Sequence, residues 1–187
     1  RTIKENTYTN LTKLFKALHP KSFIQKDINK FYKHYMNGKN VIGVHVRHGN
    51  GEEKRTKHFE NRVICKFNAF IHKLTKSIQD HGAAKFNGNY DVFLCTDSDR
   101  VSEALSVFFP KIILSPSWKP PLDAGIDFDN AYSHPDGPVA VAAAALVDIY
   151  LLAKCNSVLV GRPTEFVSMV PYIMDSVDAE YFDLDIR

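Results

Sequence analysis

The sequence predicts an α/β domain in which a parallel sheet is covered by helices on both faces. Short runs of β-branched and aromatic residues alternate with longer stretches of helical periodicity, and most of the connections between them are short. The short runs are apolar throughout, which is typical of strands that are buried on both faces. A length of 187 residues, with 44% hydrophobic and 24% charged residues, fits one globular domain and excludes a disordered or fibrous protein.

The first 39 residues are expected to form a helical arm that precedes the sheet. Residues 24–35 carry apolar side chains at helical spacing, and lysines occupy the opposite side of that helix. The apolar positions are Ile24, Ile28, Phe31, Tyr32 and Tyr35. Gly38 is expected to end the helix, and a first strand is predicted at residues 41–46.

The next elements alternate between helix and strand. Apolar residues recur at helical spacing from residue 63 to residue 78, which predicts a long helix that ends near Gly82. A second buried strand is predicted at residues 91–95. Asp97 or Ser98 is expected to cap a short helix that runs to about Phe108, and a third strand follows at residues 112–114.

The last part of the chain begins with a loop rich in proline, aspartate and glycine. Pro138 fits the first turn of an apolar helix that is expected to end near Cys155. A fourth strand is predicted at residues 158–160, a helix at 164–174 and a short final strand at 181–182. Together these elements predict a Rossmann-like domain over residues 40–187, whose ligands bind beyond the carboxyl ends of the strands, near the switch point.

The end of the first strand combines basic side chains with glycines. His45, Arg47 and His48 are followed by Gly49, Asn50 and Gly51. The guanidinium fork matches a phosphate, and glycines let backbone N–H groups approach one closely. The segment is neither a GxGxxG dinucleotide fingerprint nor a Walker A loop. It predicts an anion site, with a surface turn around a structural arginine as the alternative.

The end of the second strand reads Thr96-Asp97-Ser98-Asp99. Two carboxylates at this spacing form a DxD motif, which in one large class of sugar transferases holds Mn²⁺ against a nucleotide diphosphate. The alternative is helix capping by this segment, with a ligand contact from Thr96 or Asp97. We favour capping, because a three-residue match is weak evidence for a metal.

Asp148 is the only acidic residue in the apolar helix that follows Pro138. A carboxylate in such a setting is costly unless it is paired or faces a cleft. It has the chemistry to accept two N–H donors, such as those on the edge of a guanine. The alternative is that Asp148 lies exposed on the outer side of its helix.

Three segments together resemble the α-1,6-fucosyltransferase family, most closely its nodulation branch. They are residues 45–52, residues 92–98 followed by Phe109-Pro110, and residues 145–155 followed by Pro163-Thr164. Their order and spacing agree over roughly residues 40–175. The resemblance implies one half of a GT-B fold, namely the half that binds GDP-fucose. It also implies fucose transfer with inversion to an N-acetylglucosamine-containing oligosaccharide, without a metal or other cofactor.

The resemblance assigns roles to individual residues. Arg47 would grip the β-phosphate and stabilise the departing GDP, as a fixed charge at a leaving group should. His45 would lie beside the diphosphate. His48 would belong to the donor site, at a position where the animal enzymes have a second arginine. Glu52 is the candidate general base that deprotonates the acceptor hydroxyl, with Glu53 nearly as suitable.

The remaining donor contacts are expected from later segments of the chain. Thr96 and Asp97 would line the donor site, and Asp148 would accept hydrogen bonds from guanine N1 and N2. Thr164 would contact the phosphates from the N-terminus of the last helix. A length of 187 residues leaves no room for the other GT-B half. We therefore expect a missing N-terminal domain or a homo-oligomer, or else a non-catalytic module that binds a GDP-sugar.

The net charge of +3, from 24 Lys and Arg against 21 Asp and Glu, hides a strong polarity. Residues 1–90 carry 18 basic and 6 acidic side chains, a balance of +12, whereas residues 91–187 carry 6 and 15, a balance of −9. The lysines of the arm are spaced around a helix, with few stacking aromatics on the same side. A solvated face is therefore expected rather than a nucleic-acid partner.

No segment is expected to span a membrane. The longest apolar run, residues 139–152, is too short, and the first thirty residues lack the apolar region of a signal peptide. This suits the cytoplasm if the source is bacterial, although a chain trimmed at its start would look the same.

Cys65, Cys95 and Cys155 lie in apolar contexts without CxxC spacing, so free buried thiols are expected.

Overall fold

The computed structural model describes residues 2–48, 67–119, 134–161, 164, 166–174 and 180–183. In this part of the chain the strands form one five-stranded parallel sheet in the order β3-β2-β1-β4-β5. The strands are β1 (Val41–Val46), β2 (Asp91–Thr96), β3 (Ile113–Leu114), β4 (Ser157–Val160) and β5 (Glu180–Asp183). The predicted α/β class with a Rossmann-like parallel sheet is confirmed, and so is the short final strand.

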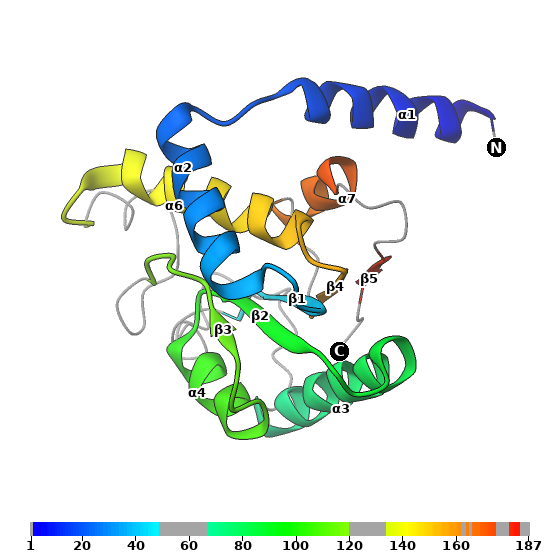
Figure 1. The fold of residues 1–187 in the computed structure, drawn as a ribbon, viewed down its shortest axis with the longest axis vertical. Helices are drawn as coiled ribbons and strands as arrows, with labels where there is room; N and C mark the ends of the chain where they lie inside the picture. Colours follow the sequence, from blue (N-terminus) through cyan, green and yellow to red (C-terminus); the bar gives the residue numbers. More distant parts are fainter. Residues whose placement is uncertain are drawn as a thin grey trace, which may run out of the picture.

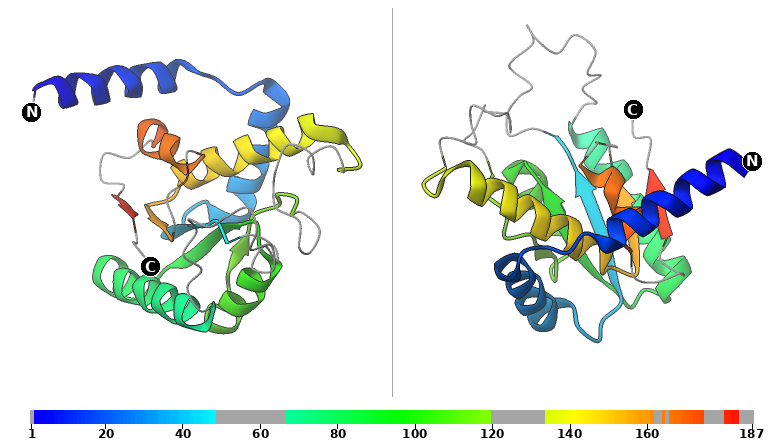
Figure 2. Two further views of the ribbon diagram at one scale, coloured as in Figure 1. Left: turned by 180° about the vertical axis from the view of Figure 1, so that it is seen from behind. Right: turned by 90° about the horizontal axis from the view of Figure 1, so that it is seen from above.

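Helices cover both faces of the sheet (Figures 1 and 2). One face is covered by α2 (Ser22–Phe31), α6 (Gly137–Ala153) and α7 (Val170–Ile173). The other face is covered by α3 (Phe67–Phe86) and α4 (Asp99–Phe108). The first helix, α1 (Thr2–Ala17), runs alongside α7 and extends away from the sheet, with the ring of Phe15 stacked 5.5 Å from that of Tyr172.

Strand residues divide between two cores because successive side chains point to opposite faces. In β2, Phe93 and Cys95 join the core beneath α6, whereas Val92 and Leu94 join the core beneath α3 and α4. The helical arm contributes to the first of these cores: Ile24, Ile28 and Met36 are buried there. The full burial of the central strands explains why their sequences are apolar without alternation.

Three helix predictions need correction. The arm helix continues from α2 into a π-helical turn, η1 (Tyr32–Met36), which buries Met36 and leaves Tyr35 exposed. The extra residue in that turn rotates the side chains away from ordinary helical spacing. Near the end of the chain the predicted helix 164–174 is a 3₁₀ turn, η3 (Val167–Met169), followed by the single turn of α7.

Gly82 does not end its helix. A Cβ atom there would lie 2.0 Å from Cε1 of Tyr90, so the glycine makes room for a ring that packs against α3. The helix ends four residues later, where Asn87 and Gly88 adopt positive φ angles of 50° and 78°. Left-handed conformations of this kind are the usual way to end a helix.

The strand order places a switch point beside β1. From β1 the chain moves to β2 and β3 on one side of the sheet and to β4 and β5 on the other. Val46 of β1 pairs with Thr96 of β2, and His45 pairs with Val160 of β4, so the carboxyl ends of these three strands are level. Ligands of open α/β sheets bind at such an edge.

Candidate functional site

The predicted residues of the first two strand ends come together at the carboxyl edge of the sheet. The Nη1 atom of Arg47 lies 2.5 Å from Oδ2 of Asp97, and the backbone N–H of His48 donates to Oδ1 of Asp97 over 2.9 Å. The side chain of Asp97 is only 4% exposed, whereas that of Arg47 is 25% exposed. The carboxylate therefore lies beneath the guanidinium, which is the more accessible partner.

Ser98, and not Asp97, caps the helix that follows. Its Oγ atom accepts a hydrogen bond from the backbone N–H of Val101, and its own N–H donates to Oγ1 of Thr96 over 3.2 Å. The sequence left the cap open between Asp97 and Ser98. Because the hydroxyl of Ser98 caps the helix, both oxygens of Asp97 can bind groups at the end of β1.

Asp99, the second carboxylate of the DxD pattern, faces a different cation. It is 58% exposed, and its Oδ1 atom lies 2.9 Å from Nζ of Lys119. The same ammonium donates to Oγ of Ser102 over 2.9 Å. Both carboxylates of the pattern therefore form ion pairs with basic side chains. Within the described residues, no three or more His, Cys, Asp or Glu side chains gather as they would around a metal ion.

His45 lies beneath the same edge with an unpaired ring nitrogen. Its side chain is 7% exposed, and Nδ1 has no hydrogen-bond partner in the structure. The ring stacks against Phe166, with 5.7 Å between the ring centroids. Burial lowers the pKa of His45 from 6.5 to about 4; the charge of Asp97 opposes this shift, and Arg47 adds to it. The imidazole is therefore neutral at pH 7, with Nδ1 buried and unpaired.

Asp148 is buried, so its predicted alternative as an exposed surface carboxylate is wrong. It is 6% exposed and accepts a hydrogen bond at Oδ1 from Oγ of Ser115, which follows β3. Burial raises the pKa of Asp148 from 3.8 to about 6, and hydrogen bonds from Ser115 and Ser117 partly offset this rise. Burial also raises the pKa of the nearby Cys95 thiol, and the charge of Asp148 adds to that effect.

An aromatic cluster beside the first strand end was not foreseen from the sequence. The guanidinium of Arg100 lies 3.8 Å from the ring centroid of Phe67, and His48 contacts the same ring edge-on at 5.3 Å. Phe67 begins α3 and Arg100 is the second residue of α4. The start of α3 thus supplies the ring, and the start of α4 supplies the guanidinium, that lie beside the end of β1. The sequence signal for Arg100 was its position directly after the DxD pattern.

Ser115, Ser117 and Phe166 were also missed. Ser115 and Ser117 could have been found, because they lie within three residues of the end of a predicted strand and so at the same edge as the other strand ends. The Oγ1 atom of Thr164 accepts from the backbone N–H of Val167 over 3.4 Å, at the start of η3. The candidate bases Glu52 and Glu53 lie outside the described residues, as do the glycines that follow His48.

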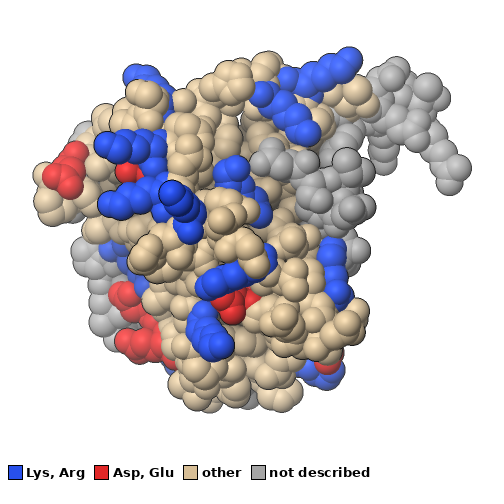
Figure 3. Space-filling model, viewed as in Figure 1, with Lys and Arg blue, Asp and Glu red and all other residues tan. Residues whose placement is uncertain are grey.

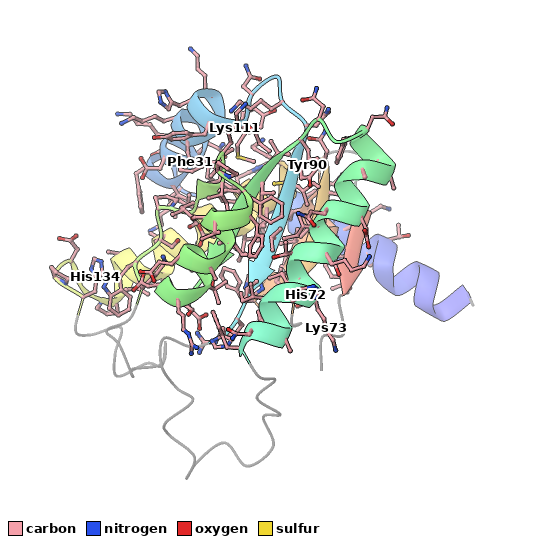
Figure 4. All side chains as sticks on the ribbon, turned by 90° about the horizontal axis from the view of Figure 1, so that it is seen from below. Phe31, His72, Lys73, Tyr90, Lys111 and His134 are labelled. Atoms are coloured by element: carbon pink, nitrogen blue, oxygen red, sulfur yellow. The ribbon has the colours of Figure 1, made fainter. Side chains whose placement is uncertain are left out.

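Figure 4 shows the two ends of the sheet. His134 lies just before the start of α6, on the side of the candidate site, and its ring meets that of Trp118 edge-on at 5.4 Å. Tyr90, which directly precedes β2, and Lys111, two residues before β3, lie toward the opposite end. The thiols of Cys95 and Cys155 are free and buried, as predicted; Cys65 lies outside the described residues. None of the described helices is long and apolar enough to cross a membrane.

Comparison with known proteins places this arrangement in a family. The family described as Nodulation protein Z (NodZ) matches residues 8–186. Nodulation protein Z of Bradyrhizobium diazoefficiens is 30% identical over 151 residues, which cover 81% of this chain and 39% of that protein. Nodulation protein Z of Sinorhizobium fredii is 30% identical over 153 residues, covering 81% of this chain and 44% of that protein. The chain thus spans about two fifths of the length of these relatives.

Solved structures agree with this result. NodZ α-1,6-fucosyltransferase co-crystallised with GDP superposes with a TM-score of 0.57 and 26% identity, over 81% of this chain and 41% of that one. A structure of POFUT1 in complex with GDP, with a TM-score of 0.52 and 12% identity, shares the fold alone. The match over residues 8–186, together with the relatives at 30% identity, shows that the chain belongs to the NodZ family.

Proposed function

We propose that this chain is the donor-binding part of a GDP-fucose-dependent fucosyltransferase. The observation that carries the proposal is the arginine at the switch point: Arg47 projects from the end of β1 and is held by Asp97 from the neighbouring strand. A partly exposed guanidinium at this place fits a diphosphate. The solved NodZ structures support the choice of ligand, because they were obtained with GDP and with GDP-fucose.

The nucleotide would extend from Arg47 across the carboxyl edge of the sheet. Asp148 lies near the end of β2, as its effect on Cys95 indicates, and would accept from N1 and N2 of a guanine. His45 offers an unpaired ring nitrogen at the end of β1, on the side of the diphosphate. Thr96, Thr164 and His48 remain proposed contacts of the donor.

The proposed reaction is a displacement with inversion at the anomeric carbon of fucose. A hydroxyl of an N-acetylglucosamine-containing oligosaccharide forms the new bond to that carbon, its proton passes to Glu52 or Glu53, and the bond to the β-phosphate breaks. Arg47 would stabilise the negative charge that develops on the departing GDP. No metal is needed for this step, since the arginine supplies the positive charge at the leaving group.

Ligand-dependent thermal stability tests the donor site. GDP, unlike ADP or UDP, should raise the melting temperature of the chain in the presence of a chelator. Saturation to about 100 times Kd corresponds to about 2.7 kcal/mol of added stability. Arg47→Ala should abolish the shift. Lys111→Ala, which removes one positive charge at the opposite end of the sheet (Figure 4), should leave it unchanged. A full GDP shift in Arg47→Ala would refute the assignment.

Two further arms separate the alternatives. The alternative function is that of a module that binds a GDP-sugar without transferring it. Incubation with GDP-fucose and chitooligosaccharides, followed by mass spectrometry of the sugars, distinguishes turnover from binding alone. A metal-dependent transferase would instead bind GDP only with Mn²⁺, and the Asp99→Ala variant would lose this Mn²⁺-dependent binding.

A further inference from the structure

The strongest unexplained feature of the site is the burial of Asp97 beneath Arg47. A residue that contacts the donor directly needs an oxygen directed at the ligand. The two oxygens of Asp97 instead engage the end of β1: Oδ2 lies 2.5 Å from Nη1 of Arg47, and Oδ1 accepts from the N–H of His48 over 2.9 Å. A carboxylate placed against a diphosphate would also repel it. Both observations argue against a direct contact between Asp97 and the donor.

The position of Asp97 suits it to hold other groups in place. It follows the last residue of β2 and precedes the Ser98 cap of α4, so its backbone is fixed by the sheet on one side and the helix on the other. Its carboxylate then fixes two features of the neighbouring strand end at once. One is the orientation of a long, flexible arginine side chain, and the other is the backbone of the residue that follows it.

We propose that Asp97 is a positioning residue that orients the guanidinium of Arg47 and anchors the backbone at His48, so that the donor's diphosphate meets a preorganised cation. This inference rests on the proposed function, because it concerns how the same site takes a nucleoside diphosphate. Its physical basis is preorganisation: a group that is already held in its binding geometry loses little freedom when the ligand arrives.

A comparison of two ligands separates this role from a direct contact. Asp97→Asn keeps the size of the side chain but removes the charge that holds Arg47. Because the role acts through Arg47 on phosphate, the variant should bind GDP about tenfold or more weakly and bind guanosine as the unmodified chain does. Asp91→Asn is the matched control. It removes a carboxylate that pairs with Lys39 at 2.8 Å, at the other end of the same strand.

A double-mutant cycle supplies the second readout. If Asp97 acts through Arg47, Asp97→Asn should cost little further GDP affinity in an Arg47→Ala protein, because the effects of coupled residues are not additive. Calorimetric titration with millimolar GDP and guanosine measures the affinities of four proteins: the unmodified chain, the two single variants and the double variant. The melting temperature without ligand shows whether each variant is folded. If Asp97→Asn is not folded, Asp97→Glu, which keeps the charge but displaces it, should show the same loss confined to GDP.

The outcomes decide between the possibilities. Loss of GDP affinity with guanosine binding retained, and no further loss in the Arg47→Ala background, supports the positioning role. Equal losses for GDP and guanosine, an unchanged GDP affinity, or a full additional loss in the Arg47→Ala protein overturns it. If the unmodified chain binds neither ligand, the proposed function itself fails.

Discussion

Asp148 and His45 are buried ionisable side chains whose pKa values shift in opposite directions. The pKa of Asp148 rises from 3.8 to about 6, because burial disfavours its charged form. The pKa of His45 falls from 6.5 to about 4 for the same reason. In the folded chain Asp148 therefore binds its proton more tightly than in the unfolded chain, whereas His45 binds its proton more weakly.

The signs of the two contributions to stability follow from these directions. The contribution of Asp148 is fully present below pH 3.8 and is lost as the pH rises through about 6. That of His45 is present above pH 6.5 and is lost as the pH falls through about 4. Between pH 4 and 6 the two slopes oppose each other, so the titration of one side chain masks that of the other.

Asp148→Asn should expose this compensation. The difference in unfolding free energy between the variant and the unmodified chain should shift in favour of the variant by up to about 3 kcal/mol from pH 4 to pH 7. The cause is that the variant no longer carries a buried carboxyl group that ionises over this range. Urea unfolding at a series of pH values measures the difference. A difference that is independent of pH would show that Asp148 titrates as an exposed carboxyl group does.

The sequence identified the residues of the candidate site better than it identified their partners. Arg47 and Asp97 were expected at one edge because parallel strands end together. The sequence did not predict that Asp97 would hold Arg47 while Ser98 caps the helix. Each acceptor near a strand end has several possible donors, and the sequence does not show which one it takes. The burial of Asp148 depends on the path of the chain after β3, which local periodicity does not determine.

At the scale of elements, the close approach of α6 to β1 depends on Gly43. A Cβ atom at this position would lie 2.9 Å from Sγ of Cys155 and 3.0 Å from Cδ2 of Leu152. Leu152 belongs to α6, and Cys155 follows its end. The first distance is shorter than real Cβ contacts and the second is tighter than most of them, so the neighbouring side chains or the end of the helix would have to shift to admit a larger residue.

Gly43→Ala should therefore destabilise the chain by about 1–3 kcal/mol, although glycine is normally a poor residue for a strand. The loss should be smaller in a Cys155→Ala background, because the nearest clashing atom is then absent. Urea unfolding of the two single variants and the double variant gives this coupling. Purely additive losses would mean that Cys155 does not limit the approach of the helix.

The strands were easier to predict than the helix ends. Burial on both faces makes β1, β2 and β4 mostly apolar, without alternation, and this signal is visible in the sequence. The helix ends are less visible: α3 runs four residues past Gly82, a glycine that makes room for the ring of Tyr90 instead of ending the helix. The π-helical turn at the end of α2 likewise has no sequence signature in the spacing of apolar residues.

At the scale of the whole molecule, the basic side chains of the helical arm are separated from the candidate site. Lysines and arginines spread over the part of the surface where α2 lies (Figure 3). The arm reaches β1 at its amino end, whereas Arg47 lies just beyond its carboxyl end. A strand of six residues spans about 20 Å, which exceeds the screening length of about 8 Å at physiological ionic strength. The lysines of the arm should therefore contribute little to anion binding at the switch point.

Replacing two of these lysines tests the separation. Lys30 and Lys33 are exposed in α2 and η1, close to the amino end of β1. The double variant Lys30→Gln/Lys33→Gln should bind GDP within about twofold of the unmodified chain at 0.15 M salt, because screening removes their field at the site. Calorimetric titration at this salt concentration and at 0.02 M measures the effect.

Arg47→Ala, with one positive charge removed instead of two, should lose far more affinity at both concentrations. A loss in the lysine variant comparable to that of Arg47→Ala would mean that the nucleotide lies along the arm and not at the carboxyl edge of the sheet.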